Sequence, residues 1–488
     1  MPMTTTAEGD RAAGRATGAG ARAPVGTGGP AHRLPTVEST WKALRYGLDL
    51  DNGLIGELGR RDISRTRVGT RRFVGLAKAE YVDHVLHAAR LKYVKSAEFA
   101  PIRMAAGLNL LTDEGESWAT HRGALNPVFA RRRLNGLVNL MIEPVEEMTA
   151  RYPADPGERM VLDLHEEMVQ MTLRVVANAL FSQDFGPIIN SMHDLATKGL
   201  RAAEALNRLT MTGLMGDRSW RAVGRVSRSR VQIPRPLGTL QEVAHGLDDA
   251  VREVVDARIA NPTDRPDLLN ALLGADEGSW TRQRVYDEAL TFMLAGHETT
   301  ANALTWFWYL LALNPSALDR MLTEVDTVLQ GRAPTVDDLG SLPWTQACVQ
   351  ESQRYFSAVP TLPRTAIEHD VIDGHHIRPG TTVVIPVQAL HHDPRYWERP
   401  AEFDPSRFMP GAPRITRSAY LPFGGGRRVC IGQSFALMEM VLIAAITAQK
   451  VTFQLVPGHP VLTEATLTLR PRHGLQVVAR PRTAEADR

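Results

Sequence analysis

The chain has 488 residues, of which 43% are apolar and 23% charged, and its formal net charge at pH 7 is only +2. A chain of this length and composition can bury a large core, and its near-neutral charge argues against general binding of nucleic acid. Its two cysteines allow one disulfide at most, which is typical of a protein kept in the reducing cytoplasm.

The first 34 residues are rich in Ala, Gly, Arg and Thr and lack a periodic apolar pattern, so residues 1–34 are predicted to be a disordered tail. The arginines leave a transit peptide open, although Glu8 and Asp10 weaken that interpretation. A signal peptide or a transmembrane anchor would need a continuous apolar run near the N-terminus, and the tail has none. Because no linker tract divides the remainder, residues 35–488 are expected to form one domain.

Trp118 and Arg122 are four residues apart, which would place them on one face of a helix. A surface arginine stacked on a tryptophan can have the same spacing, and His121 between them is expected to face solvent. Farther on, segment 188–240 could cover a lipophilic ligand. Ordinary helix packing explains the same apolar residues equally well: Leu206, Leu209, Met211, Leu214, Met215 and Trp220.

One long helix is predicted from residue 282 to residue 313, where Asn314 and Pro315 would end it. The segment is apolar nearly all round, so the helix is expected to be buried. A transmembrane span is the alternative. The polar residues in the middle of the segment argue against it, because lipid would penalise them.

Residues 295–300, in the middle of that helix, read A-G-H-E-T-T. Gly296 is expected to open space beside the helix, and the Thr299 hydroxyl can bond back to the Ala295 carbonyl. An acid such as Glu298 beside a hydroxyl in a buried gap can deliver protons. A capped or water-bridged kink would contain the same residues.

Glu351 and Arg354 lie three residues apart on a helical run, a spacing worth only about 0.2–0.5 kcal/mol at a surface. Downstream, turn signals at residues 373–374 and 379–380 separate alternating segments and predict short β-hairpins. His391 and His392 are adjacent, and on an extended strand they would point to opposite faces, so they are not expected to share a metal.

Segment 423–432 reads F-G-G-G-R-R-V-C-I-G, and an apolar helical run follows it. The thiolate is the ligand form of sulfur, and the N-terminus of the following helix would lower the pKa of Cys430. Gly426 and Gly432 would let the backbone pass close to a flat, bulky partner, and Arg428 could pair with a carboxylate of that partner. With Phe423 packed over the sulfur, these features fit one axial sulfur ligand on haem iron.

Other uses of Cys430 fit less well. A structural zinc site needs about four Cys or His ligands at short spacing, and Cys348 lies far upstream without such a cluster. A buried, inert thiol is the usual state of a lone cysteine, and the chemistry of the loop is what argues against it.

The pattern F-x-x-G-x-R-x-C-x-G, complete at residues 423–432, resembles the haem-binding loop of cytochrome P450 monooxygenases. Three further segments resemble motifs of that family, in the family's order: W-x-x-x-R at 118–122, A-G-x-E-T-T at 295–300 and E-x-x-R at 351–354. The resemblance extends over about residues 35–482. It implies the cytochrome P450 fold, which is mainly α-helical with small β-sheets.

The resemblance also implies roles for single residues. Thr299 is implied to steady dioxygen and Glu298 to relay protons, while Cys430 is implied to bind the iron of haem b. The implied haem-binding residues are Cys430, Arg428, Phe423, Gly426, Trp118, Arg122 and Arg364, with the arginines and the tryptophan near the propionates.

A structural role is implied for Glu351 and Arg354, because the family closes a buried cluster with a third partner, which is Arg407 here. Removing one member of a buried ionic cluster costs about 3–5 kcal/mol, since it leaves the other charges without a partner. These three residues are therefore assigned to stability and not to chemistry.

The implied activity is that of a monooxygenase that uses dioxygen to hydroxylate or epoxidise a lipophilic organic substrate. Because the chain has no room for a fused flavin reductase, its electrons are expected from a separate ferredoxin or flavodoxin with a reductase. An acidic partner of this kind could be attracted by arginines that the resemblance places near the cysteine side: Arg122, Arg131, Arg132, Arg133 and Arg427.

Two rival functions are weighed against this one. A haem-thiolate isomerase or peroxygenase would need no external electrons, and the intact pair of Glu298 and Thr299 argues against it. A haem-based sensor or binding protein would share the fold without turnover.

Overall fold

The computed structural model describes residues 32–33, 35–36, 38–40, 54–155, 157–182, 237–275 and 280–482, with single residues and short runs between 194 and 213. Most of the predicted N-terminal tail lies outside the described residues. Its last part includes strand β1 (His32–Arg33), which pairs in parallel with strand β2 (Ile63–Val68). That residues 35–488 form one domain stays a prediction.

Segment 188–240 is described only in part. Leu206, Met211 and Leu240 are buried, being 1%, 3% and 0% exposed. The remaining apolar residues singled out in this segment lie outside the described residues: Leu209, Leu214, Met215 and Trp220.

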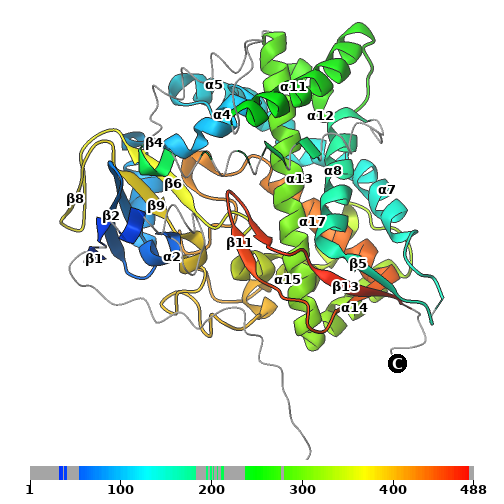
Figure 1. The fold of residues 1–488 in the computed structure, drawn as a ribbon. Coiled ribbons are helices and arrows are strands. Elements are labelled where there is room, and N and C mark those ends of the chain that lie inside the picture. Colours follow the sequence, from blue (N-terminus) through cyan, green and yellow to red (C-terminus); the bar gives the residue numbers. More distant parts are fainter. Residues whose placement is uncertain are drawn as a thin grey trace, which may run out of the picture.

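The central element is helix α13 (Arg282–Leu313), which is 32 residues long and runs through the middle of the molecule (Figure 1). It begins where the Thr281 side chain accepts a hydrogen bond from the Arg284 N–H, and it ends at Asn314, before Pro315 opens the next helix. Trp306, in its second half, is only 1% exposed. The buried helix predicted from 282 to 313 is therefore confirmed.

The other helices pack around α13, and α8, α11, α15 and α17 all contact it. The largest hydrophobic core lies among α7, α8, α13, α14 and α17. The bounds of these and the remaining helices are α2 (Leu54–Leu58), α3 (Ala79–Asp83), α4 (Ala100–Ala106), α5 (Gly115–Leu125), α6 (Arg131–Asn135), α7 (Val138–Thr149), α8 (Leu164–Phe181), α11 (Leu237–Ala260), α12 (Leu268–Leu273), α14 (Pro315–Leu329), α15 (Pro343–Tyr355), α16 (Val387–Leu390) and α17 (Gln433–Lys450).

Short helical turns connect these elements and carry parts of the site. They are η1 (His84–Ala88), η2 (Arg90–Lys92), η3 (Ala97–Phe99), η4 (Asn126–Phe129), η6 (Asp337–Ser341), η7 (Pro405–Phe408) and η8 (Gly426–Arg428). The turn η8 lies within the cysteine loop, directly before α17.

The described strands form small sheets at the sides of the helices. The six-stranded sheet has the order β1-β2-β3-β9-β6-β4 and lies on the left in Figure 1. Its other strands are β3 (Arg71–Leu76), β4 (Tyr93–Lys95), β6 (Leu362–Ala366) and β9 (Thr382–Ile385). The smaller sheets join β10 (Val451–Leu455), β13 (Gln476–Pro481) and β5 (Met160–Asp163), then β11 (Thr463–Ala465) with β12 (Leu469–Pro471), and β7 (Asp370–Ile372) with β8 (His375–Ile377).

The two turn signals have different outcomes. Asp373 and Gly374 adopt φ values of 47° and 73° and join β7 to β8, so the first predicted hairpin is present. The turn at residues 379–380 does not close a second hairpin with β8. The strand that follows it, β9, pairs with β6 and β3 in the six-stranded sheet, because it brings a fully buried run into that core.

The mainly α-helical architecture with small sheets agrees with the fold class predicted from the sequence. Within the described part of the chain, no helix is both long and apolar enough to cross a membrane.

Candidate functional site

The cysteine loop, residues 423–432, is held in shape by its own backbone. The Cys430 N–H donates to the Phe423 carbonyl over 2.9 Å, which closes the loop on itself. Gly426 has a φ of 68°, and a Cβ on it would lie 2.2 Å from the carbonyl oxygen of Leu86 in η1. Glycine is therefore required there so that the loop can pack against η1.

Neighbouring elements fix the ends of this loop. The buried His391 accepts a hydrogen bond at Nε2 from the Leu421 N–H over 2.8 Å. Burial, together with the nearby charge of Arg354, lowers the pKa of His391 to about 3, so the ring is neutral and can accept. His391 thus supports the loop. Its neighbour His392 contacts the Gln388 carbonyl through Nδ1 at 3.0 Å.

The predicted cluster of Glu351, Arg354 and Arg407 is present in the structure. Glu351 and Arg354 are both fully buried and form a bidentate pair, with N···O distances of 2.7 and 2.8 Å. Arg407 Nε lies 3.5 Å from Glu351 Oε1. Arg354 also donates to the carbonyls of His391, Pro400 and Glu402, which tie α15 to the segment that leads into the cysteine loop.

A cavity of about 700 Å³ lies between the cysteine loop and α13. Its floor includes Phe423, Cys430 and Gly432, and its wall includes residues 294–300 of α13. The accessible surface of Cys430 faces this cavity, because the side chain is otherwise enclosed by protein. Gly432 lines the cavity and Gly426 does not, and that Gly426 lets a flat partner approach stays a prediction.

The Cys430 thiol has a pKa above its ordinary value because it is buried. The Gly432 N–H at the start of α17 lowers the pKa, as the sequence predicted, and the charges of Arg122 and Lys95 act in the same direction. Burial outweighs all three, so the predicted net lowering of the Cys430 pKa is wrong for the haem-free protein. The second cysteine, Cys348, is fully buried in α15, and burial raises the pKa of its thiol as well.

On the α13 side, Thr299 donates its hydroxyl proton to the Ala295 carbonyl over 2.7 Å, as predicted. Glu298 accepts a hydrogen bond at Oε1 from the Thr468 hydroxyl over 2.9 Å. Gly296 lines the cavity, which agrees with the expected open space beside the helix. A Cβ on it would lie 2.9 Å from Val176 Cγ2, so Gly296 also lets α8 approach α13 closely.

Three buried cations gather at one end of the cavity: Lys95, Arg364 and Arg428. Lys95 of β4 and Arg364 of β6 face each other directly in the sheet register, an arrangement of like charges that destabilises a sheet. Burial and mutual repulsion lower the pKa of Lys95 well below its ordinary value and that of Arg364 to about 10. Glu114 contacts the cluster through Arg428 and the Lys95 N–H.

Trp118 and Arg122 of α5 support the cysteine loop from outside the cavity. The guanidinium of Arg428 stacks on the Trp118 ring, 3.8 Å from its centroid, and that of Arg427 lies 5.3 Å away. Arg122 donates through Nη1 to the Val429 carbonyl over 2.9 Å. Neither Trp118 nor Arg122 lines the cavity, so they differ from Arg364 and Arg428, which do.

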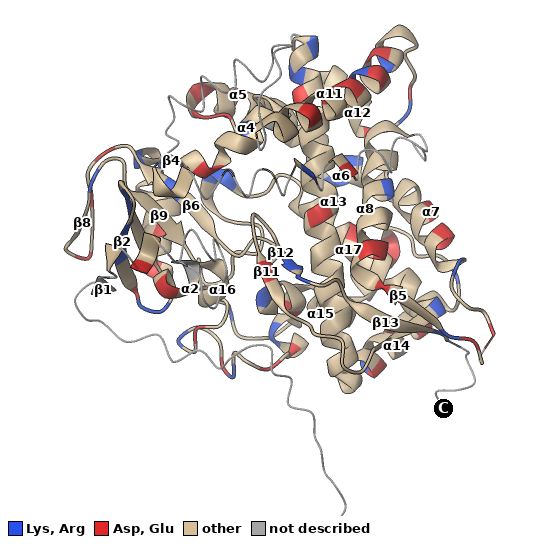
Figure 2. Ribbon diagram, in the orientation of Figure 1, with Lys and Arg blue, Asp and Glu red and all other residues tan. Residues whose placement is uncertain are grey.

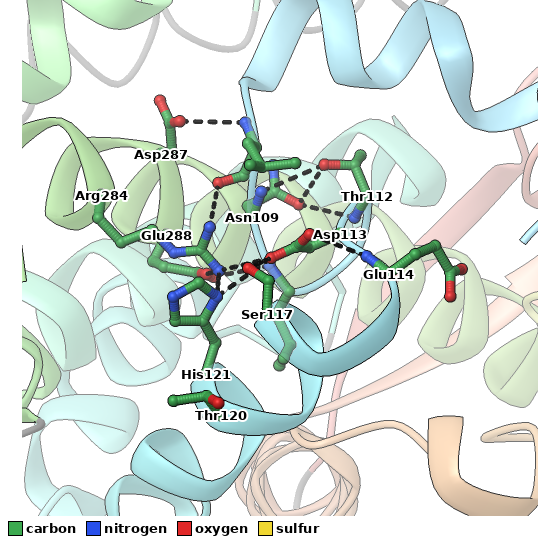
Figure 3. Close-up of polar contacts among 12 residues, drawn as sticks. Asn109, Thr112, Asp113, Glu114, Ser117, Thr120, His121, Arg284, Asp287 and Glu288 are labelled. Carbon is green, nitrogen blue, oxygen red and sulfur yellow. Dashed lines mark hydrogen bonds and ion pairs between the residues drawn. The ribbon is translucent and has the colours of Figure 1, made fainter. Parts of the chain in front are cut away.

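A polar network joins the start of α5 to the start of α13 (Figure 3). Arg284 contacts Asp113, Glu288 and His121, and its Nη1 donates to the Leu108 carbonyl over 2.8 Å. His121 was expected to face solvent and does not, because its Nδ1 lies 3.1 Å from Asp113 in this network. Since Asp113 directly precedes Glu114, the network fixes the carboxylate that pairs with Arg428 and accepts from the Lys95 N–H.

Glu288 is fully buried in this network, and burial raises its pKa to about 7. Arg284 and the Leu110 N–H, which donates to Oε2 over 3.1 Å, hold the pKa down from a still higher value. Sequence reasoning missed Lys95, Glu114, Arg284 and Glu288, because each acts through partners that are remote in the chain. The short spacing from Arg284 to Glu288 on one helix face was the one local signal.

Comparison with known proteins decides the family. The sequence pattern of the family described as Cytochrome P450 matches residues 60–478. The chain belongs to the cytochrome P450 family. It is accordingly a monooxygenase-type oxidoreductase in which haem iron is the reactive group.

This cytochrome P450 is 60% identical over 454 residues to the Mycobacterium bovis protein called cytochrome P450 132, covering 93% of this chain and 98% of that one. It is 32% identical to cyclooctatin synthase of Streptomyces melanosporofaciens, covering 86% and 87% of the two chains. It is 30% identical to the chloroplastic carotene epsilon-monooxygenase of Arabidopsis thaliana, covering 85% and 78%.

Solved structures share the fold. The crystal structure of the cytochrome P450DA haem domain superposes with a TM-score of 0.75 at 24% identity, covering 88% of this chain and 92% of that one. Another cytochrome P450 crystal structure superposes with a TM-score of 0.78 at 23% identity, covering 94% and 99%.

The residues around the cavity of this P450 fit a haem. A haem carries two carboxylates, and binding of such a ligand would relieve the repulsion among the three cations. Arg428 Nη1 is buried without a hydrogen-bond partner among the described residues, so a donor is left for one of those carboxylates. Cys430 supplies a thiol to the same cavity, and its thiolate form is the stronger sulfur ligand for iron.

Proposed function

We propose that this protein binds haem b through Cys430 and uses dioxygen and externally supplied electrons to hydroxylate or epoxidise a lipophilic substrate. The observation that carries the proposal is the single cavity that brings Cys430 to face Glu298 and Thr299. When bound, a haem with a thiolate ligand supplies dioxygen activation and cleavage of the O–O bond. The side chains of this chain would bind the cofactor, handle the protons and bind the substrate.

The carboxylates of the haem would be held by Arg428, Arg364 and Lys95, which are buried at the cavity end. Arg428 is already oriented by stacking on Trp118 and by its ion pair with Glu114, so little side-chain freedom is lost when the ligand binds. Phe423 lines the cavity beside the sulfur and restricts the access of water to it.

Protons would be handled by Glu298 and Thr299. Burial raises the pKa of Glu298 above its ordinary value, which favours the protonated form that a proton donor needs. The hydroxyl proton of Thr299 is engaged by the Ala295 carbonyl, which leaves the lone pairs of the hydroxyl oxygen free to accept from the cavity. Glu298 is hydrogen-bonded to Thr468, so transfer of a proton from Glu298 toward Thr299 requires rotation of the carboxyl or an intervening water.

The substrate is proposed to be lipophilic because the cavity wall away from the loop is largely apolar. Aromatic and aliphatic side chains from several elements line it: Phe99, Ile102, Phe129, Val169, Leu180, Leu240, Val243 and Leu247. Such walls suit an apolar ligand fixed by few polar contacts. The name of the relative carotene epsilon-monooxygenase, which acts on a hydrocarbon, agrees with this class.

The electron donor is proposed to be a separate acidic ferredoxin or flavodoxin with its reductase. Arg131, Arg132 and Arg133 are exposed and make α6 basic (Figure 2), and Arg427 is exposed on the cysteine loop. Arg131 borders a surface hollow of about 280 Å³ that also touches Ser434 in the first turn of α17, just after the loop. A partner bound there would approach the haem from the sulfur side. Arg122 donates a hydrogen bond to the Val429 carbonyl, so it contributes less to the basic docking surface.

A reducing compartment such as the cytoplasm is proposed from the cysteines. Cys348 and Cys430 are both free thiols in the structure, and the sulfur of Cys430 must stay reduced to bind iron.

Spectral binding tests with fatty acids, sterols, terpenes and macrolides would identify a ligand. Turnover with that ligand, labelled dioxygen, ferredoxin, reductase and NADPH should place one labelled oxygen atom in the product. Thr299→Ala should bind haem and ligand normally but divert most electrons to hydrogen peroxide. Product formed without reductant would favour an isomerase or peroxygenase, and ligand binding without any turnover would favour a sensor.

A further inference from the structure

Part of the cavity lining forms a polar lobe, made of side chains from the first turn of α8 and from the β11–β12 hairpin. Its lining differs from the apolar wall over the loop. It includes His165 from α8 and Glu464, Thr468 and Arg470 from the hairpin.

Glu298 is the α13 side chain that joins this lobe to the reaction site. Its Oε1 accepts the Thr468 hydroxyl over 2.9 Å, and its carboxylate is within electrostatic reach of Arg470 and His165. Thr468 itself is only 3% exposed, so this hydrogen bond is shielded from bulk water. The hairpin therefore provides the contact that orients the buried acid.

The outer end of the lobe reaches solvent. Arg470 Nε donates to Glu464 Oε2 over 2.9 Å, and the side chain of Glu464 is 34% exposed. On the α8 side, His165 Nε2 donates to Asn302 Oδ1 over 2.8 Å, one turn after Glu298 on α13. Polar groups thus continue from the surface to Glu298 without crossing the apolar substrate wall.

We propose that protons reach Glu298 from solvent through this polar lobe, with Thr468, Arg470 and His165 as positioning residues that hold its carboxyl and set its protonation. The inference rests on the proposed function and deepens it by assigning the route of proton supply. In each step a water in the lobe gives a proton to the Glu298 carboxylate and takes a proton from bulk solvent in its place. The carboxyl then releases that proton toward Thr299, which regenerates the carboxylate and changes no oxidation state.

The direction of each residue's effect follows from its charge. Burial raises the pKa of Glu298, whereas the Thr468 hydrogen bond and the charges of Arg470 and His165 lower it. Removing any of the three should therefore raise the pKa further. Other charged groups that line the cavity near the lobe are Asp163 at the end of β5, Glu166 of α8 and Arg472 just after β12, and they are left unchanged in the test.

The first test is an infrared pH titration of the purified holoenzyme, with the Glu298 carboxyl band identified by its loss in Glu298→Gln. Thr468→Val should raise the midpoint of that band by about one pH unit, and Arg470→Met should raise it by less. Thr466→Val is the matched control, because Thr466 lies in the same turn and lines the cavity without contacting Glu298. An unmoved midpoint in Thr468→Val, or an equal shift in Thr466→Val, would overturn the proposal.

The second test measures hydrogen peroxide formation from air by the holoenzyme with a plant-type ferredoxin, its reductase and NADPH. If protonated Glu298 limits the rate, the rate falls as pH rises through its pKa. In Thr468→Val and His165→Phe, the pH at which the rate falls should then move upward by the same amount as the infrared midpoint. A shifted midpoint with an unshifted rate profile would show that protons enter elsewhere. Failure of the proposed function looks different, because it abolishes oxygen reduction and leaves the infrared titration intact.

Discussion

Two buried glutamates, Glu351 in α15 and Glu298 in α13, show how the same side chain is used for stability in one place and for chemistry in another. Burial raises the pKa of both. Glu351 is held by a bidentate arginine, a second arginine and the Asp404 N–H, and no cavity touches it among those described. Glu298 has one hydroxyl partner and opens on the cavity.

The difference lies in how many partners compensate the charge. A carboxylate that is fully paired is held in one position by its partners, so Glu351 serves to fix the segment behind the cysteine loop. A carboxylate with one neutral partner has little to offset the cost of burying its charge, which favours the protonated form, so Glu298 can act as an acid. Each prediction below tests one side of this comparison.

The largest effect is expected from Arg354→Ala. The substitution leaves Glu351 buried without its bidentate partner, which costs about 3–5 kcal/mol of unfolding free energy. We expect little soluble, haem-loaded protein on expression. Arg174→Ala breaks an ion pair whose members are 38% and 52% exposed, and it should change the unfolding free energy by about 1 kcal/mol or less. Near-normal stability of Arg354→Ala would contradict the structural role of this cluster.

The next largest effect is expected at Glu288. This carboxyl has one charged partner, Arg284, and is therefore intermediate between the fully paired Glu351 and Glu298 with its neutral partner. Its pKa is raised to about 7 in the folded protein, whereas an unfolded glutamate titrates near its ordinary value. The folded state then binds the proton more tightly, so stability is present at low pH and is lost as pH rises toward 7, by on the order of 3 kcal/mol. Glu288→Gln should remove this part of the pH dependence in chemical denaturation, and Glu116→Gln at the surface should keep it.

Lys95→Met is expected to have two smaller effects of opposite sign, one on the stability of the haem-free protein and one on haem binding. Removing one of three mutually repelling cations should stabilise the haem-free protein, because Lys95 and Arg364 face each other across β4 and β6. It should also weaken haem binding by about 10- to 100-fold, since a charge-assisted hydrogen bond to a carboxylate is lost. Thermal unfolding of the haem-free protein would measure the change in stability, and the rate of haem transfer to apomyoglobin would measure the change in haem binding. Lys92→Met, whose partner is Asp370, should leave haem transfer unchanged.

The smallest effect is expected at the surface. Arg131→Glu with Arg132→Glu should slow the first electron transfer from an acidic ferredoxin by about tenfold at low salt, and the difference should shrink as salt rises, because the Debye length is about 10 Å at 0.1 M. Arg67→Glu with Arg378→Glu makes the same change of charge at exposed positions of β2 and beyond β8. Equal slowing in both pairs would exclude α6 as the docking face.

The sequence predicts those parts of the site that are local in the chain. The bounds of α13 and the bond from Thr299 to the Ala295 carbonyl follow from spacings within one helix. The burial of Glu351 with Arg354 was implied by the family resemblance and not by their spacing. The long-range parts were not accessible in this way. The partner of Glu298 is 170 residues away in the chain, and Lys95 joins the cation cluster only through the register of β4 on β6.

Gly426 and Gly296 each let another part of the protein approach the backbone, namely η1 and α8, and Gly296 also lines the cavity. A glycine in a motif indicates that something comes close to the backbone, but not whether that partner is a cofactor or a neighbouring helix. His121 was misplaced because its partners, Asp113 and Arg284, meet only in the folded chain.

The central claim is that Cys430 supplies the sulfur ligand of the haem, and the spectrum of the reduced protein with carbon monoxide tests it most directly. The wild-type protein should show the red-shifted Soret band of a thiolate-bound haem. Cys430→His should lose that band while Cys348→Ala, altered at the buried thiol of α15, should keep it. Loss of the band in Cys348→Ala together with its retention in Cys430→His would contradict the account.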